Sequence, residues 1–269
     1  TIITSLDNTT WTRQTSPTGE TLRDCEGGGN VLVAVGDNGT ILTAIDTDLA
    51  AWTIRSSGTT QGLNRVYYND TASQFVAVGD SGTILTSSDG SAWTPRTSGV
   101  MGDLTGVARG RLAGGDYFAV SDRGEIVKSE DEGATWMDAG ISLPEPGAGV
   151  AADPFANSIY ITGRDRVYYE SLDLGVTWTL KQILLPSAAA IDNVAFGNGR
   201  YVGVGGSQSM VIDENGDTRL YLQSRGFQDI TYAQGMFVAA GAHQGTESGL
   251  STSTDGISWS SVSDPHISP

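Results

Sequence analysis

The stretch FVAVGDSGTILTSSDGSAW, residues 75–93, holds two short apolar runs, a glycine-containing turn between them, and a polar turn that leads to a tryptophan. A close variant, VAVGDNGTILT, occupies residues 33–43. Pairs such as Asn38-Gly39 supply the positive φ angles that a two-residue hairpin requires. Each stretch therefore predicts two antiparallel strands joined by a tight turn, followed by a further strand that the tryptophan begins.

The pattern recurs along the whole chain. Aromatic residues mark it at intervals of 38–43 residues: Trp11, Trp52, Trp93, Trp136, Trp178, Tyr221 and Trp259. An apolar strand precedes the paired strands in each period, as at Leu63 to Tyr68 and Leu104 to Ala108. Each period is thus predicted to be a four-stranded antiparallel meander, which buries its two faces only by packing against neighbouring meanders. The sequence predicts an all-β fold, a β-propeller of four-stranded blades.

The repeat count leaves two architectures open. Residues 20–262 contain six full repeats, and residues 1–16 supply only the third and fourth strands of another. Seven blades with an incomplete first one is the favoured interpretation, and six blades with an extra strand pair is the alternative. We expect residues 1–269 to form a single propeller domain that was excised or processed from a longer chain. An incomplete blade would leave a strand edge open to a neighbouring chain or to a second copy.

The composition excludes some classes of partner. The net charge is −16, and both nucleic acid and anionic membranes need a basic surface. No apolar run reaches the roughly 18 residues of a membrane span, so we expect no membrane insertion. An acidic surface favours a cation or a basic partner, or is simply well solvated. Cys25 falls in a strand pattern and is predicted to be a small buried residue.

The turns before the tryptophans share a motif. Residues 129–136 (SEDEGATW) and 171–178 (SLDLGVTW) fit the pattern S-x-D-x-G-x-T-W, and shorter forms occur elsewhere. This motif resembles the Asp-box, or BNR repeat, of propellers that include sialidases, the photosystem II assembly factor, and secreted or phage virion proteins. The resemblance implies an extracellular, cell-surface or virion location. Its aspartates are expected to hold the turn by accepting backbone N–H groups: Asp7, Asp89, Asp131, Asp173 and Asp255.

The resemblance to sialidases implies three arginines that grip the substrate carboxylate, together with a tyrosine–glutamate pair and an acidic residue. Arg23, Arg65 and Arg109 stand in or after first strands, but the F/Y-R-I-P segment is missing and Arg109 falls late. No serine-hydrolase, zinc-protease or phosphate-loop motif is present. We therefore assign no catalytic residue, and a sialidase-like glycoside hydrolase remains the enzyme alternative.

One segment offers oxygen ligands at alternate positions, as a calcium loop does: Asp213, Asn215 and Asp217. The glycine that such a loop needs at its sixth position is replaced by Thr218, so an Asn-Gly hairpin turn is the simpler interpretation. Calcium is the only cofactor that the sequence suggests.

In a propeller the second-to-third-strand turns and the fourth-to-first-strand loops share one face, which commonly carries ligands. The candidate residues on these turns are Asp37, Asp80, Asp122, Arg123, Arg164, Asp165, Gln208 and His243. Short loops make a shallow face, which suits docking of a protein or a glycan better than catalysis. The sequence thus favours a non-catalytic binding or assembly module, with an assembly factor like that of photosystem II as a further alternative.

Overall fold

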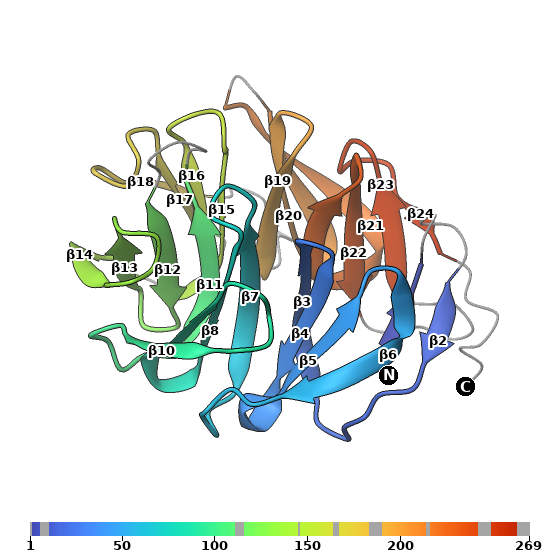
Figure 1. Ribbon diagram of the computed structural model, residues 1–269. Coiled ribbons are helices and arrows are strands. Elements are labelled where there is room, and N and C mark those ends of the chain that lie inside the picture. Colours follow the sequence, from blue (N-terminus) through green and yellow to red (C-terminus); the bar gives the residue numbers. More distant parts are fainter. Residues whose placement is uncertain are drawn as a thin grey trace. The chain divides into compact units, whose positions relative to one another are not determined.

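The computed structural model describes residues 2–5, 11–110, 116–144, 146–163, 167–182, 190–213, 216–241 and 249–262. The chain divides into two compact units, Thr1–Pro144 and Glu145–Pro269, and each is described by itself. Nearly all regular structure in the described residues is β-strand (Figure 1). No helix in this part of the chain is long and apolar enough to span a bilayer.

The first unit holds one two-stranded sheet and three four-stranded antiparallel sheets, each formed by strands that follow one another in sequence. The strands are β1 (Ile2–Thr4) and β2 (Thr12–Gln14); β3 (Leu22–Gly28), β4 (Val31–Gly36), β5 (Ile41–Ile45) and β6 (Asp48–Arg55); β7 (Leu63–Asn69), β8 (Gln74–Gly79), β9 (Thr83–Ser87) and β10 (Thr94–Thr97); β11 (Leu104–Arg109), β12 (Tyr117–Ser121), β13 (Glu125–Ser129) and β14 (Met137–Ser142). The predicted four-stranded antiparallel meanders are confirmed.

The second unit holds one four-stranded and one six-stranded sheet, both antiparallel. The strands are β15 (Gly147–Ala152), β16 (Ile159–Gly163), β17 (Val167–Ser171) and β18 (Thr179–Gln182); β19 (Asn193–Gly197), β20 (Arg200–Ile212), β21 (Thr218–Ala233), β22 (Met236–Gly241), β23 (Leu250–Ser253) and β24 (Ser260–Ser261).

The six-stranded sheet contains two repeats. Residues 200–204 of β20 pair with β19, whereas residues 208–212 pair with β21, and a register shift at Gly206 separates the two parts. Likewise, residues 218–222 of β21 pair with β20, and residues 227–233 pair with β22. The strand β20 therefore supplies the second and third predicted strands of one repeat, and β21 supplies the fourth strand of that repeat and the first strand of the next.

The turns between the second and third strands have the predicted geometry. Asn38 and Gly39 have φ angles of 54° and 68°, and Ser81 and Gly82 repeat them at 54° and 69°. These turns, η1 (Asp37–Gly39) and η2 (Asp80–Gly82), are single 3₁₀ turns, each closed by a backbone hydrogen bond from the following threonine.

The core lies between consecutive sheets. One cluster joins Val33 and Ile41 of the second sheet to Leu63 and Phe75 of the third, and Trp93 packs against it. Comparable clusters join β7–β10 to β11–β14, and β15–β18 to β19–β21. Five of the seven aromatic residues that mark the periods thus pack against the core: Trp52, Trp93, Trp136, Tyr221 and Trp259.

Cys25 is exposed, so the prediction that it is buried was wrong. Along β3 the exposed residues alternate with half-buried ones, and Cys25 is on the exposed face with Arg23 and Gly27. Ile2 of the two-stranded sheet packs against Ala34 of β4 and Leu42 of β5, and Cys25 is not part of this cluster.

We expect the Cys25 thiol of the native protein to react with a chromogenic disulfide reagent within about tenfold of its rate in denaturant, because access limits thiol reactivity. The comparison is made on the same sample before and after adding urea. A native rate slower by about three orders of magnitude would contradict the exposed position.

Candidate functional site

The aspartates predicted for a ligand face in the first unit hold neighbouring sheets together. Arg23 of β3 lies 2.6 Å from Asp37 Oδ1 and 3.7 Å from Asp80 Oδ1, and it also donates a hydrogen bond to Asn64. The amide of Asn64 in turn donates to Asp80 at 3.0 Å. One arginine therefore pairs with both carboxylates, and this network accounts for Asp37 and Asp80 without a ligand.

Asp122 has a similar role in the third repeat. Its Oδ1 accepts the backbone N–H of Asp103 at 2.9 Å, and its own N–H donates to the Asp103 carbonyl at 2.9 Å. Arg123 beside it is exposed, whereas Gln208 is buried within β20 and is therefore not part of an open surface. The other predicted face residues, Arg164, Asp165 and His243, lie outside the described residues.

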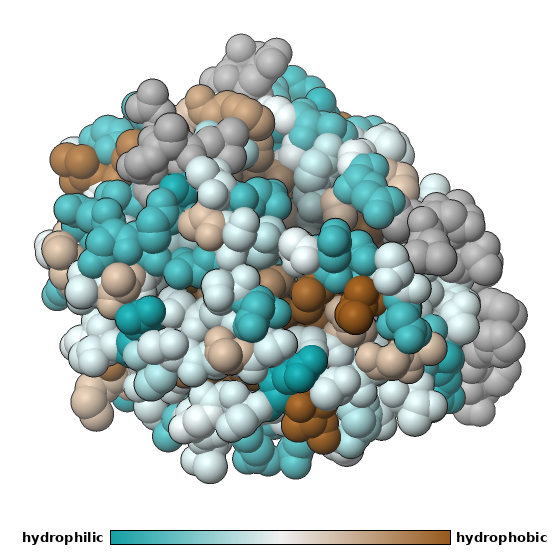
Figure 2. Space-filling view, in the orientation of Figure 1, coloured by the Kyte–Doolittle hydropathy of each residue, from teal (hydrophilic) through white to brown (hydrophobic). Residues whose placement is uncertain are grey.

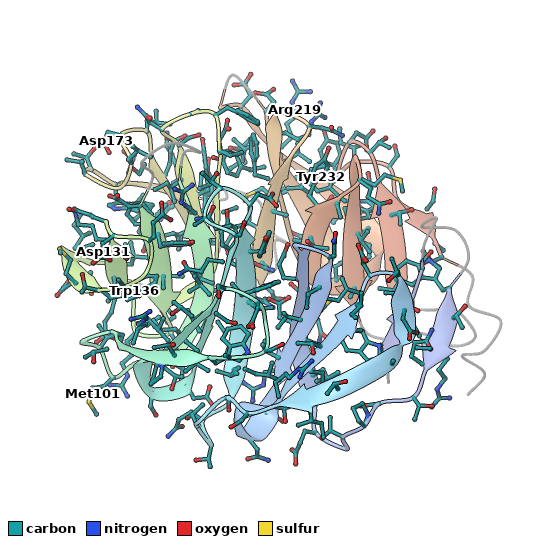
Figure 3. All side chains as sticks on the ribbon, in the orientation of Figure 1. Met101, Asp131, Trp136, Asp173, Arg219 and Tyr232 are labelled. Atoms are coloured by element: carbon teal, nitrogen blue, oxygen red, sulfur yellow. The ribbon has the colours of Figure 1, made fainter. Side chains whose placement is uncertain are left out.

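The motif aspartates close their own turns. Asp131 accepts the backbone N–H of Thr135 at 2.8 Å and its hydroxyl at 2.6 Å, and Ser129 donates to the same carboxylate at 2.9 Å. These donors lower the pKa of Asp131 to about 2. Asp131 and Trp136 lie together at the turn between β13 and β14 (Figure 3). The side chains thus make the contacts that a structural turn requires.

In three other motif turns the aspartate also accepts hydrogen bonds from its own turn. Asp173 accepts from Thr177 with the same two distances, 2.8 and 2.6 Å. In the shorter turns, Asp89 and Asp255 each accept two consecutive backbone N–H groups. Asp7 lies outside the described residues.

The segment considered for calcium forms a turn closed by its own hydrogen bonds. Asp213 Oδ1 accepts the backbone N–H of Asp217 at 3.0 Å, and the Asp213 carbonyl accepts that of Gly216 at 2.9 Å. Within the described ranges, no three metal-ligating side chains of histidine, cysteine, aspartate or glutamate come together. Asn215 lies outside those ranges, so calcium at this turn stays a prediction.

The arginines considered for a sialidase-type site have different partners. Arg23 is the second residue of β3 and pairs with Asp37 and Asp80, whereas Arg109 is the last residue of β11. Arg109 is buried and lies 2.9 Å from Glu132 Oε1. Since the first strands of these repeats pack alongside one another, Arg23 and Arg109 stand at opposite strand ends and do not converge on one substrate carboxylate.

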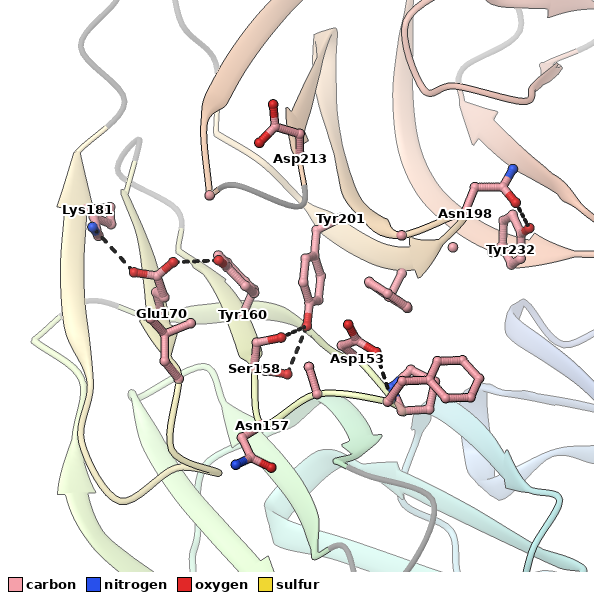
Figure 4. Close-up of a pocket in the computed structure, with 18 residues that line it drawn as sticks. Asp153, Asn157, Ser158, Tyr160, Glu170, Lys181, Asn198, Tyr201, Asp213 and Tyr232 are labelled. Atoms are coloured by element: carbon pink, nitrogen blue, oxygen red, sulfur yellow. Dashed lines mark hydrogen bonds and ion pairs between the residues drawn. The ribbon is translucent and has the colours of Figure 1, made fainter.

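A pocket of ≈ 1040 Å³ opens in the second unit, between the β15–β18 sheet and β19–β21 (Figure 4). Turn residues 153–158 and 197–199 form two of its walls, and Asp213 with Gly216 forms a third. These are first-to-second-strand and third-to-fourth-strand turns, whereas the sequence analysis placed its candidates on second-to-third-strand turns. Of the predicted residues that the structure describes, only Asp213 lines this pocket.

Aromatic side chains form the floor of the pocket. The rings of Tyr160 and Tyr201 lie 4.1 Å apart, and Phe196 lies 4.8 Å from Tyr201. Both tyrosines are buried and belong to the core cluster between the two sheets. The rim is apolar where it is most open, because Phe155 and Leu172 are 80% and 64% exposed. Such a site has a rigid floor and exposed apolar groups at its edge.

The charged residues of the pocket are mostly acidic. Asp153, Glu170 and Asp213 line it, with Lys181 as the one basic residue among the lining positions. Glu170 lies 3.3 Å from Lys181 Nζ and accepts the Tyr160 hydroxyl at 2.5 Å. Burial and this hydrogen bond raise the pKa of Tyr160. Tyr160 therefore stays protonated at neutral pH and holds Glu170 in place.

The pocket was not foreseen because its residues match no motif. Tyr160 and Glu170 are ten residues apart in separate strands and meet because β16 and β17 pair at this position. One local signal was available: the connection between β15 and β16 covers residues 153–158, whereas the equivalent turn between β3 and β4 is only Gly29 and Asn30. A lengthened turn on a rigid repeat is a common sign of a binding site.

Comparisons with known proteins support the fold. No family model matches the sequence, and no curated protein matches it. Among solved structures, YCF48 bound to a D1 peptide aligns with a TM-score of 0.68 and 19% identity, covering 91% of this chain and 81% of that chain. The WD40 propeller domain of Doa1 gives 0.72 and 14%, with coverage of 94% and 85%. A chain of the nidogen/laminin complex gives 0.66 and 10%, with coverage of 87% and 93%. The chain therefore has the predicted β-propeller fold, built from four-stranded antiparallel blades.

Proposed function

We propose that this propeller is a non-catalytic protein-binding module, which docks an extended segment of a protein partner at the pocket between β15–β18 and β19–β21. The observation that carries this proposal is the combination of a buried aromatic floor with the exposed Phe155 and Leu172 at the rim. Protein interfaces are enriched in aromatic anchors that lie in preformed pockets. The similar propellers include one bound to a peptide and one in a protein complex, which fits this role.

Hydrolysis of a sialoside is disfavoured at this site. The Tyr160–Glu170 pair has the residue types of a sialidase nucleophile, but the raised pKa of Tyr160 opposes its ionisation. Among the residues that the structure describes, no arginine lines the pocket, and the pocket's carboxylates would repel an anionic sugar. The cross-strand pair is better explained as a support for the pocket wall.

Two finer proposals accompany this function. The turns that Asp131 and Asp173 close are of the Asp-box type, because serine, aspartate, glycine and threonine make the same contacts in both. The module belongs to an extracellular, cell-surface or virion assembly, as the repeat resemblance implies. In Figure 2 hydrophobic side chains form small separate areas among hydrophilic ones.

The experiment selects displayed random peptides of about 12 residues with the purified chain and repeats the selection with Phe155→Ser/Leu172→Ser. Peptides selected by the parent chain are expected to bind the double variant at least about tenfold more weakly, because each apolar rim side chain contributes buried area. Val176→Ser is the matched control, since Val176 is 72% exposed in the same turn as Leu172 but does not line the pocket.

Peptides that bind the double variant as well as the parent would place the docking surface elsewhere. A parallel glycan array with product analysis covers the alternative class. Saturable glycan binding that Phe155→Ser abolishes would replace the protein partner by a sugar, and released sugar would overturn the non-catalytic assignment.

A further inference from the structure

The charges around the aromatic floor indicate what kind of side chain the pocket accepts. Three carboxylates line it from three separate segments: Asp153 after β15, Glu170 in β17 and Asp213 after β20. Lys181 lies beside Glu170 and offsets one of these charges. In the view of Figure 4, Tyr201 lies between the Glu170–Tyr160 pair and Asp153, with Asp213 above it. The acidic groups thus surround the floor instead of gathering in one loop.

We propose that this pocket recognises the guanidinium group of an arginine side chain in the docked partner segment. This inference rests on the proposed docking function and adds the chemistry of the recognised residue. A guanidinium is planar, so its face packs on an aromatic ring while its edge donates to carboxylates. The 80% exposed ring of Phe155 at the rim and the three carboxylates that line the pocket match both parts of that group.

Each carboxylate is held by the fold before a ligand arrives. Asp153 accepts the backbone N–H of Phe155 at 2.7 Å, and Asp213 accepts that of Asp217 at 3.0 Å. A carboxylate has about four lone-pair positions, so Asp153 can accept an N–H donor from a ligand in addition to its turn bond. Preorganised carboxylates lose little conformational entropy on binding, which favours a charged hydrogen bond at this site.

Charge complementarity also favours a cationic occupant over other ligands. The whole chain carries a net charge of −16, and the carboxylates that line the pocket outnumber its basic side chain. An acidic or phosphorylated segment would be repelled here. A purely apolar segment would remove water from the carboxylates that line the pocket, at a desolvation cost.

The test uses two small probes on the full chain: Nα-benzoyl-arginine amide and its neutral isostere Nα-benzoyl-citrulline amide. Binding is followed by the backbone amide shifts of ¹⁵N-labelled protein. The arginine probe is expected to bind at least about tenfold more tightly than the citrulline probe, and its affinity should fall as salt is raised. The shifts should map to the turns at residues 153–158 and 197–199.

Asp153→Asn/Asp213→Asn keeps the acceptor that closes each turn and removes both charges, so the arginine probe should bind about tenfold more weakly. Asp46→Asn changes one charge on an exposed turn of the first unit and should leave affinity within about twofold. Lys181→Gln removes the competing cation beside Glu170 and should tighten binding by about threefold. A gain of affinity cannot arise from misfolding, so it tests the inference independently.

Equal binding of the two probes, or shifts confined to other parts of the chain, would overturn the arginine assignment, and so would the absence of binding by either probe. The docking proposal is separable from it. In one outcome, selected peptides bind the parent but not Phe155→Ser/Leu172→Ser, and keep their affinity when arginine is replaced by citrulline. That result would support the docking site and contradict the recognition of an arginine.

Discussion

Gly79→Ala is expected to destabilise the protein by about 2–4 kcal/mol, measured as the change in free energy of unfolding in urea. A Cβ atom at this position would lie 2.0 Å from the carbonyl oxygen of Gly62 and 2.9 Å from Leu63 Cα. That carbonyl is held in place because it accepts the backbone N–H of Asp80 at 2.8 Å. The alanine methyl group and the loop before β7 therefore cannot both keep their positions.

The cause is steric and does not involve backbone strain. Gly79 has a φ of −168°, an extended conformation that any residue adopts. The same close approach recurs at the end of the second strand in other repeats, where a Cβ on Gly36, Gly205 or Gly241 would lie within 2.0 Å of a carbonyl oxygen. The glycine at this repeat position is thus required by packing of the strand end against the preceding loop.

The third repeat has a serine instead of this glycine at the end of its second strand. Ser121 occupies the equivalent position, paired with Leu104, and its side chain is fully buried. Gly102 lies opposite, and a Cβ there would come 2.9 Å from Ser121 Oγ. The absence of a side chain at Gly102 therefore leaves the space that the Ser121 side chain occupies.

Gly19→Ala is the matched control, because a Cβ at Gly19 has nothing within 4 Å. It should change the free energy of unfolding by less than about 0.5 kcal/mol. If Gly79→Ala proved as stable as Gly19→Ala, the loop before β7 would have to move freely, and the packing argument would be wrong.

Much of the fold could be predicted because every repeat has the same pattern of strands and turns. The apolar run at Leu63 to Tyr68 became β7 (Leu63–Asn69), and Thr83 to Thr86 became β9 (Thr83–Ser87). A local error in one repeat is corrected by the others when the period is this regular. Residues 200–212 were harder, because a register shift at Gly206 replaces the usual turn and joins two strands into β20.

The pocket could not be predicted, because it depends on pairing and on the contact between two repeats. Tyr160 and Glu170 are cross-strand partners, and Tyr201 reaches them from the next repeat. The charged turn residues that sequence analysis favoured, such as Asp37 and Asp80, were correctly placed on turns but are paired with Arg23. Sequence shows that such a residue lies at a turn, but the structure is needed to show which partner it meets.

The stability of the protein is expected to fall as the pH rises from about 5 to 8, because of Glu26. Burial, and then the neighbouring carboxylates of Asp24 and Asp70, raise the pKa of Glu26 to about 8. In the unfolded chain a glutamate titrates near pH 4.3, so between these two values the folded state binds the extra proton. The contribution of Glu26 to stability is therefore complete below the unfolded pKa and declines until the folded pKa is reached, by at most about 5 kcal/mol in total.

At low pH the motif aspartates have the opposite effect on stability, which falls as the pH is lowered. Hydrogen bonds from Thr135 hold the pKa of Asp131 at about 2, and comparable bonds lower those of Asp89 and Asp173. A lowered carboxyl pKa stabilises the fold above the unfolded value near 3.9, and this contribution is lost as the pH falls through the folded value. Stability should therefore peak near pH 5, between the titration of the motif turns and that of Glu26.

Glu26→Gln separates the two effects, because the amide carries no charge at any pH. The variant should lose the decline between about pH 5 and 8, so that it becomes more stable than the parent at pH 8, while the acid side of the curve is unchanged. Glu20→Gln removes an exposed carboxylate and should follow the parent at every pH. A parent curve that is flat from pH 5 to 8, or a variant curve that keeps the parent's slope, would mean that Glu26 is ionised in the folded protein. The strand β3 would then hold the charge of Glu26 beside that of Asp24.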